Sequence, residues 1–170
     1  MDIWIGTSGY SYPDWVGEFY PAGTRSNKML AYYCCFFPLV ELNFTFYRPP
    51  TRDMLARLAA NSPDGFQFLV KLPRSLSHEQ SRTDLPAFRL AVKELHQRKQ
   101  LMGLLCQLPQ STHFERKSQM WLETLGGELA DFCLAVEFRH RSWWREDLPD
   151  WMAGHHLDLV AVDVPDLPKL

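Results

Sequence analysis

Two pairs of polar residues, each spaced by two positions, end apolar runs that read as buried strands. Glu137 and Arg139 end one run, and Glu41 and Asn43 end another. Because side chains alternate along a strand, the members of each pair point the same way. Glu137 could then be a general base or nucleophile, and Arg139 could hold a phosphate or carboxylate bidentately. The structural alternatives are an ion pair for Glu137–Arg139 and a strand-bracing hydrogen-bond network for Glu41–Asn43.

Three further polar residues end other apolar runs. Lys71 could anchor a phosphate or form a Schiff base, and the alternative is an ion pair with Glu41 or Glu137. Gln107 would position a ligand, and Asp163 would assist the catalytic groups. Glu41 and Glu137 together could serve as the carboxylate pair of a glycoside hydrolysis or a sugar isomerisation. The expected catalytic set is therefore Glu137, Glu41, Lys71 and Asp163.

Histidines and tyrosines in the loops complete the expected binding set. His78 follows Lys71, and His140 directly follows Arg139. Tyr12 and Tyr47 belong to an aromatic cluster that mainly packs two loops, but their hydroxyls suit ligand contact. The expected ligand-binding residues are Arg139, Asn43, Gln107, Tyr12, Tyr47, His78 and His140.

A metal site is not favoured. A divalent cation would draw on Glu41, Glu137, Asp163 and either His78 or His140. No apolar run carries histidine at its own end, so solvated loop histidines are the simpler interpretation. No metal ligand is assigned, and the cofactor remains unknown.

Short apolar runs alternate with helical patterns along the chain. Continuously apolar runs are typical of parallel strands covered on both faces. A potential N-cap at Asp84 and a capping-box pattern, Thr112 with Glu115, mark two helix starts. The expected strands are Ile3–Gly6, Val40–Asn43, Phe66–Leu72, Leu101–Leu108, Phe132–Phe138 and Leu157–Val164; the expected helices are 26–37, 52–61, 85–99, one after Glu115, and 147–155.

The alternation predicts an α/β fold with a parallel sheet, either doubly wound or a TIM-type (β/α) barrel. The Gly-rich phosphate loop of the doubly wound dinucleotide-binding folds is absent. Polar residues instead recur at the ends of successive strands, which converge at the mouth of a barrel. A full barrel has eight units and roughly 250 residues. We therefore expect residues 1–170 to be one barrel domain with six of its eight units, incomplete at the C-terminus.

Composition narrows the functional classes. The 170 residues contain 18 Lys+Arg and 20 Asp+Glu, a formal net charge of −2 that excludes bulk nucleic-acid binding. No apolar run approaches the roughly 20 residues of a membrane helix, and the N-terminus does not read as a signal peptide. The four cysteines form neither a disulfide pattern nor a metal motif. A cytoplasmic protein without membrane association is expected.

Ordered motifs along the chain resemble the YecE-like family, also called the domain of unknown function 72. They are Ile5–Trp15, Phe19–Pro21, Val40–Tyr47, Val70–Arg74, Gln107–Pro109 and Val136–His140 followed by Ser142 and Trp143. The resemblance implies a TIM-type barrel, and members continue through two more strands. It supplies no established reaction, because the family is largely uncharacterised.

The expected function is that of a hydrolase or lyase acting on a phosphorylated, sugar-like or nucleic-acid-derived ligand at the barrel mouth. Its partner would be a small-molecule or nucleotide-like ligand. The alternatives are a non-catalytic protein that binds a small anionic metabolite, and an inactive truncated remnant. Because an incomplete barrel exposes the edges of its first and last strands, self-association through those edges is also expected.

Overall fold

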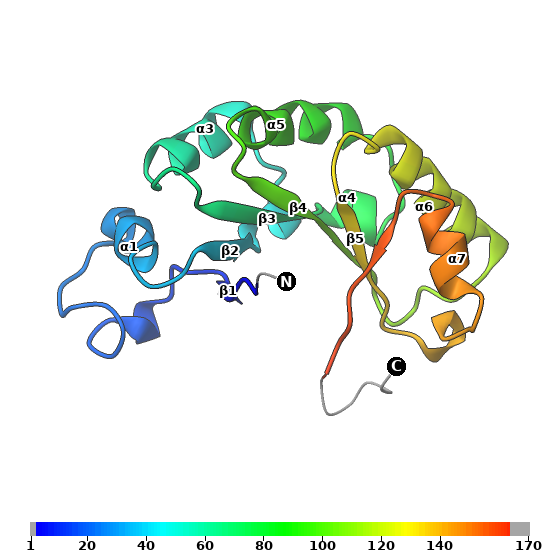
Figure 1. Ribbon diagram of the computed structural model, residues 1–170, viewed down its shortest axis with the longest axis horizontal. Helices are drawn as coiled ribbons and strands as arrows, with labels where there is room; N and C mark the ends of the chain where they lie inside the picture. Colours follow the sequence, from blue (N-terminus) through cyan, green and yellow to red (C-terminus); the bar gives the residue numbers. More distant parts are fainter. Residues whose placement is uncertain (1–2, 164–170) are drawn as a thin grey trace.

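The computed structural model describes residues 3–163, and its centre is a six-stranded parallel sheet. The strands pair in chain order, each with the next. They form an arch in which the sheet occupies the inner side (Figure 1). The strands are β1 (Gly6–Ser8), β2 (Leu39–Leu42), β3 (Gln67–Lys71), β4 (Leu101–Gln107), β5 (Leu134–Glu137) and β6 (Asp158–Leu159).

The longer helices lie on the outer side of the arch (Figure 1). They are α1 (Ser26–Tyr33), α3 (Arg52–Ala60), α5 (Leu85–Gln97), α6 (Arg116–Glu128) and α7 (Leu148–Ala153). Four short elements follow strand ends and carry loop side chains: the 3₁₀ turns η1 (Pro13–Trp15) and η2 (Arg141–Trp143), and the helices α2 (Phe44–Tyr47) and α4 (Arg74–Ser77).

The main core lies between the sheet and the outer helices. Alternate strand residues such as Val40, Phe68 and Val136 are fully buried, as are Leu95 of α5 and Leu122 of α6. The intervening strand positions therefore face the inner side of the arch. Pairing places Ser8 beside Glu41 and Gln107 beside Glu137 on neighbouring strands. The strand register alone therefore brings these polar residues together, without any contribution from the loops.

The expectation of buried strands is wrong at the two ends of the sheet. β1 begins at Gly6 rather than Ile3, and Ile3 and Ile5 are 83% and 64% exposed. β6 contains only Asp158 and Leu159, both exposed. Apolar composition indicates a preference for burial, but burial also needs a neighbouring element. Among residues 3–163, the edge strands β1 and β6 each have a paired strand on one side only. Val164, expected in the last strand, lies outside the described residues.

Asp84 occupies the predicted N-cap position of α5, but neither predicted side-chain capping bond is present. Asp84 immediately precedes α5, but its carboxylate accepts a hydrogen bond from the Ser75 hydroxyl, at 2.5 Å, instead of capping the helix. Helix α6 begins at Arg116, so Glu115 occupies the N-cap position and Thr112 lies outside the helix. The Thr112 carbonyl instead accepts a hydrogen bond from the Trp143 indole at 2.9 Å. At Asp84 a tertiary partner takes the carboxylate, whereas at Thr112 the helix begins too far along the chain for the hydroxyl to cap it.

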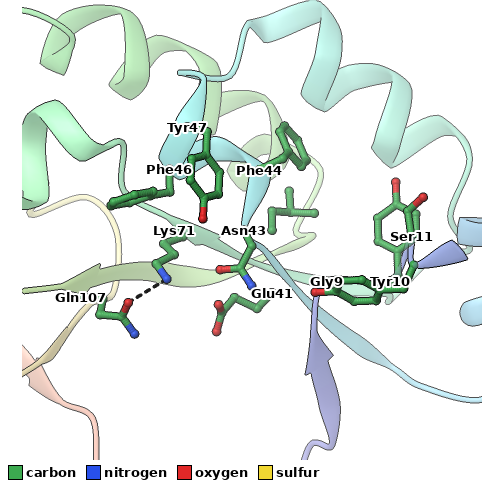
Figure 2. Close-up of a pocket in the computed structure, with 12 residues that line it drawn as sticks. Gly9, Tyr10, Ser11, Glu41, Asn43, Phe44, Phe46, Tyr47, Lys71 and Gln107 are labelled. Atoms are coloured by element: carbon green, nitrogen blue, oxygen red, sulfur yellow. Dashed lines mark hydrogen bonds between the residues drawn. The ribbon is translucent and has the colours of Figure 1, made fainter. Parts of the chain in front are cut away.

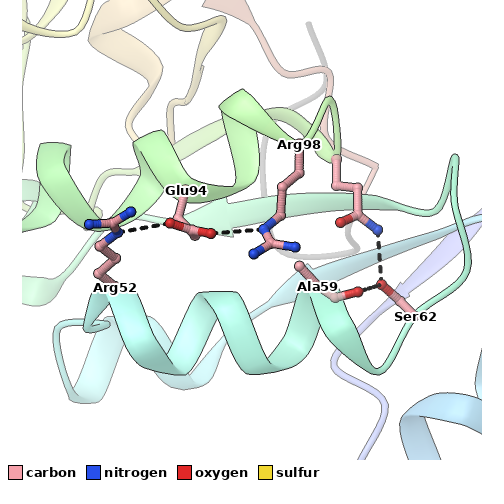
Figure 3. Close-up of polar contacts among 6 residues, drawn as sticks. Arg52, Ala59, Ser62, Glu94 and Arg98 are labelled. Atoms are coloured by element: carbon pink, nitrogen blue, oxygen red, sulfur yellow. Dashed lines mark hydrogen bonds and ion pairs between the residues drawn. The ribbon is translucent and has the colours of Figure 1, made fainter.

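A shared carboxylate links α3 and α5 (Figure 3). Glu94 of α5 accepts hydrogen bonds from Arg52 of α3 and from Arg98, each at 2.8 Å. These bonds hold the pKa of Glu94 below its ordinary value. A second link runs from Gln100 to the Ser62 hydroxyl, which donates to the Ala59 carbonyl, both at 3.0 Å. Both ends of α3 are therefore linked to the C-terminal part of α5 and the residues that follow it.

Within residues 3–163, no helix combines the length and the apolar character needed to cross a membrane. The four cysteines are free thiols. Burial raises the pKa of Cys34 and of Cys106 to about 12, so these thiols stay protonated at neutral pH.

Candidate functional site

A cavity of about 570 Å³ lies where the carboxyl ends of β2, β3 and β4 meet the loops that follow β1 and β2. Figure 2 shows polar side chains from three strand ends pointing into one space beneath an aromatic rim. Parallel strands end at the same edge of a sheet, which explains this convergence. Six expected site residues line the cavity: Tyr12, Glu41, Asn43, Tyr47, Lys71 and Gln107.

Lys71 is the last residue of β3 and provides the cationic group of the cavity. Its ammonium donates to the Gln107 side-chain oxygen at 2.9 Å and lies 5.5 Å from the centre of the Phe46 ring. The buried Thr45 hydroxyl lies 2.6 Å from the Lys71 carbonyl and anchors the strand end. Lys71 forms no ion pair with any residue from 3 to 163. The alternative of an ion pair with Glu41 or Glu137 is therefore wrong, and the charge faces the cavity with neutral partners.

Glu41 of β2 provides the carboxylate of the cavity. It accepts a hydrogen bond from the Ser8 hydroxyl at 2.8 Å. The Asn43 amide donates in turn to the Ser8 hydroxyl oxygen. This short chain across β1 and β2 orients Glu41 without neutralising it, because serine and asparagine carry no charge. Glu41 keeps its capacity to accept further hydrogen bonds or a proton from a bound ligand.

Glu137, although adjacent to this site, is held in an ion pair. Only 7% of the residue is exposed, and its carboxylate lies 2.6 Å from the Arg139 guanidinium. The Gln107 amide donates to the same oxygen at 2.8 Å. Neither Glu137 nor Arg139 lines the cavity. This geometry matches the structural alternative of an ion pair for Glu137 and Arg139, and it leaves Glu41 as the carboxylate that lines the cavity.

The two expected tyrosines lie on opposite parts of the rim. The Tyr12 hydroxyl donates to the Ser8 carbonyl, and its ring packs 4.9 Å from that of Trp15. Tyr47 at the end of α2 is 85% exposed, and its ring packs edge-on against Phe46 at 5.1 Å. Figure 2 shows its hydroxyl directed toward Lys71 and Asn43. Tyr47 is therefore free to contact a ligand, whereas Tyr12 is committed to the backbone of β1.

The remaining expected residues lie outside the cavity lining. His78 ends α4 and packs edge-on against Phe46, 4.8 Å between ring centres. Burial, followed by the nearby charges of Arg74 and Lys71, lowers the pKa of His78. His140 stacks on His113 at 3.8 Å, in the loop after β5. Asp163 follows β6 and is exposed.

No group of three or more metal-ligating side chains converges anywhere in residues 3–163. Two of the three carboxylates of the hypothetical metal set are separately engaged: Glu41 with Ser8, and Glu137 with Arg139. The described residues therefore offer hydrogen-bonding and ionic groups for a ligand, without a prearranged cation site.

Sequence reasoning did not select the aromatic wall of the cavity. Tyr10, Phe44 and Phe46 line it, whereas the sequence predicts ligand contact only for Tyr12 and Tyr47 of the aromatic cluster. Their position immediately after strand ends was the available signal, because loops at that edge surround the mouth of a barrel. Composition alone does not separate a packed ring from a ligand-facing one.

The chain was compared with known proteins. The family described as "Protein of unknown function DUF72" matches residues 4–170. The UPF0759 protein YunF of Bacillus subtilis (strain 168) is 28% identical over 151 residues, and the match covers 84% of this chain and 52% of YunF. The chain thus spans about half the length of this relative.

Solved structures give the same relationship. The DUF72 family protein TM1631 of Thermotoga maritima MSB8 is 36% identical, with a TM-score of 0.85 over 98% of this chain and 66% of that protein. The DUF72 family protein EF0366 of Enterococcus faecalis V583 is 20% identical with a TM-score of 0.76, a likeness of fold alone. The resemblance noted in the sequence is confirmed, and this chain belongs to the DUF72 family, a family of unknown function.

Proposed function

We propose that the six-stranded arch is part of a (β/α) barrel and that the chain forms one domain. Two observations support this proposal. The strands follow each other in chain order without the reversal that defines a doubly wound sheet. The long helices lie on one side only, as in the helical ring around a barrel (Figure 1). On this view the cavity lies at the C-terminal mouth of the barrel.

We infer that the cavity binds a small phosphorylated or sugar-like ligand, including nucleotide fragments, and hydrolyses or eliminates a bond within it. The observation that carries this proposal is the placement of Lys71 and Glu41 on one cavity without an ion pair between them. A cation and a carboxylate that do not neutralise each other can hold an anion and move a proton at the same time. Asn43, Gln107 and Tyr47 add neutral hydrogen-bonding groups.

For a phosphate ester, the proposed step is a hydrolysis. Lys71 holds a phosphoryl oxygen and balances its charge. Glu41 takes a proton from a water molecule, whose oxygen bonds to phosphorus as the bond to the leaving oxygen breaks. The leaving oxygen takes up a proton from solvent, and Glu41 returns its own proton to solvent. In an elimination, Glu41 would instead take the proton from the carbon adjacent to a carbonyl. A carbon–carbon double bond forms as the bond from the next carbon to the leaving oxygen breaks, and that oxygen takes up a proton from solvent.

The competing function is non-catalytic binding of an anionic metabolite at the same residues. The test combines hydrolysis of bis(p-nitrophenyl) phosphate, followed by p-nitrophenolate release, with calorimetric binding of ribose 5-phosphate. Loss of a proton-transfer group costs about 10²–10⁴-fold in rate. We expect Glu41→Gln to lose turnover to that extent while ribose 5-phosphate affinity changes less than about tenfold. Binding without turnover in the wild-type protein would favour the metabolite-binding function.

We also propose that copies of the chain associate through the edges of the sheet. Within residues 3–163, β1 pairs only with β2, and β6 only with β5, so each offers an unpaired edge. Exposed Ile3, Ile5 and Leu159 lie along these edges. Light scattering after gel filtration should show mass rising with concentration, and Ile5→Lys should suppress the rise. A constant monomer mass, or association unaffected by Ile5→Lys, would contradict this proposal.

A further inference from the structure

A second, smaller cavity lies beside the first. It measures about 330 Å³ and sits between α1, α3 and the start of α2. Its lining combines polar and apolar side chains: Ser26, Asn27 and Leu30 of α1, Met54, Arg57 and Leu58 of α3, and Asn61, Tyr10 and Phe44. Neither the sequence motifs nor the proposed function uses this space.

The two cavities share one wall, formed by Tyr10 and Phe44. Tyr10 is held in place because its carbonyl accepts a hydrogen bond from the buried Tyr20 hydroxyl and its ring packs against Tyr33 at 6.2 Å. Burial raises the pKa of Tyr10, so its phenol remains uncharged. Phe44 is 37% exposed. These two rings therefore supply apolar surface to both cavities.

The smaller cavity is cationic. Arg57 is its one charged lining residue among those described, and no carboxylate lines it. Asp53, one turn earlier on α3, forms no ion pair with Arg57, and neither does any other residue from 3 to 163. Ser26, Asn27 and Asn61 line the same cavity with uncharged polar groups, and the Asn61 amide donates to the Arg57 carbonyl at 2.7 Å. An anionic group is therefore the ligand that this cavity would favour.

The two adjoining cavities form one continuous surface. It begins at the cation Lys71, passes the rings of Tyr10 and Phe44, and ends at a second cation, Arg57. Single-stranded nucleic acids are bound by this combination, in which positive groups hold phosphates and aromatic rings stack on bases. A neutral sugar or a single phosphate would leave one of the two cavities unused. The local arrangement is compatible with the formal net charge of −2, because only a short segment would be held.

Building on the proposed function, we propose that the ligand is a short single-stranded oligonucleotide that spans both cavities. One phosphate lies at Lys71, a base or sugar packs on Tyr10 and Phe44, and a further phosphate lies at Arg57. Arg57 is then a residue that sets ligand length, whereas Lys71 and Glu41 act at the reacting end.

The test is calorimetric binding of thymidylates of one, two and three nucleotides, each with a 5′-phosphate, at fixed ionic strength. The wild-type protein should bind the longest probe about tenfold or more tighter than the mononucleotide. Arg57→Gln should abolish that gain and leave mononucleotide affinity unchanged. Lys28→Gln is the matched control, because it removes one positive charge from exposed α1 without touching either cavity lining. It should leave the gain intact.

Four outcomes would overturn the inference. Affinity independent of probe length would show that the second cavity is not used. A gain with length that Arg57→Gln leaves intact would place the additional contact elsewhere. Binding of ribose 5-phosphate but of no thymidylate would overturn the inference while the proposed function stands. If neither ribose 5-phosphate nor any thymidylate binds, the proposed function fails as well.

Discussion

The ammonium of Lys71 is connected to the carboxylate of Glu137 through a single amide, that of Gln107. Lys71 donates to the Gln107 oxygen at 2.9 Å, and the Gln107 nitrogen donates to Glu137 at 2.8 Å. An amide satisfies a cation and an anion simultaneously and carries no charge itself. The positive charge of Lys71 therefore stays available to the cavity, while Glu137 is neutralised by Arg139.

Substitution of Gln107 tests this separation of charges. Gln107→Glu places a carboxylate within ion-pair distance of Lys71, so ribose 5-phosphate affinity should fall about tenfold or more. Gln107→Met keeps the side-chain length without the charge and should change affinity less than about threefold. Calorimetric titration of both variants checks the prediction. Equal losses in the two variants would show that the amide, rather than the charge of Lys71, determines affinity.

His78 should report the charge of Lys71. The pKa of His78 is lowered by burial first, then by Arg74 and Lys71, while Glu79 opposes the shift. Removing a neighbouring positive charge favours the protonated ring. Lys71→Met should therefore raise the pKa of His78 toward 6.5, as should a bound phosphate, and NMR titration of the ring protons measures it. An unchanged pKa in Lys71→Met would place Lys71 too far from His78 to affect it.

The ionisation of Glu94 should make the free energy of unfolding depend on pH. Its folded pKa lies below the ordinary value of 4.5 because Arg52 and Arg98 donate to it. A lowered folded pKa contributes stability above the unfolded value, and that contribution disappears as pH falls through the folded pKa. Glu94→Gln should therefore reduce the free energy of unfolding at pH 7, and its difference from wild type should shrink by pH 3.

Urea unfolding at the two pH values measures the effect. Glu79→Gln is the control, because the Arg74–Glu79 pair is largely exposed on both sides. It should change stability little at either pH. A deficit in Glu94→Gln that persists unchanged at pH 3 would show that packing, not the ion pairs, accounts for the loss.

Two adjacent glycines of α6 should respond oppositely to alanine. A Cβ on Gly126 would overlap the His155 carbonyl oxygen, whereas one on Gly127 would meet no described atom within 4 Å. We expect Gly126→Ala to lower the free energy of unfolding by about 1–3 kcal/mol. Gly127→Ala should raise it by about 0.5–1 kcal/mol through helix propensity. Denaturant unfolding compares them, and equal effects would contradict the close approach of α6 to the loop after α7.

The sequence was a good guide to where strands end and a poor guide to what their polar side chains contact. Lys71, Gln107 and Glu137 gave the same signal, a polar residue closing an apolar run. Only the structure separates Lys71, which faces the cavity, from Glu137, which is bound by Arg139. That difference depends on side chains reaching across neighbouring strands, and a one-dimensional pattern holds no information on such contacts.

The edges of the sheet show a second limit. Ile3–Ile5 has the composition of a buried strand, but the pairing register of β1 with β2 begins at Gly6. Hydrophobic periodicity reports which residues favour burial, not whether a neighbouring strand is present to provide it. The sequence pattern also did not identify the Arg57 cavity, because its lining comes from three helices and two loop residues that are separated in sequence.

The most direct test of the central claim compares ribose 5-phosphate with ribose by calorimetry in the wild-type protein, Lys71→Met and Lys28→Met. The wild-type protein and Lys28→Met should bind the phosphorylated sugar about tenfold or more tighter than ribose. Lys71→Met should lose this preference. A wild-type protein without a phosphate preference, or a preference that survives in Lys71→Met, would contradict the assignment of Lys71 as the anion-holding group of the cavity.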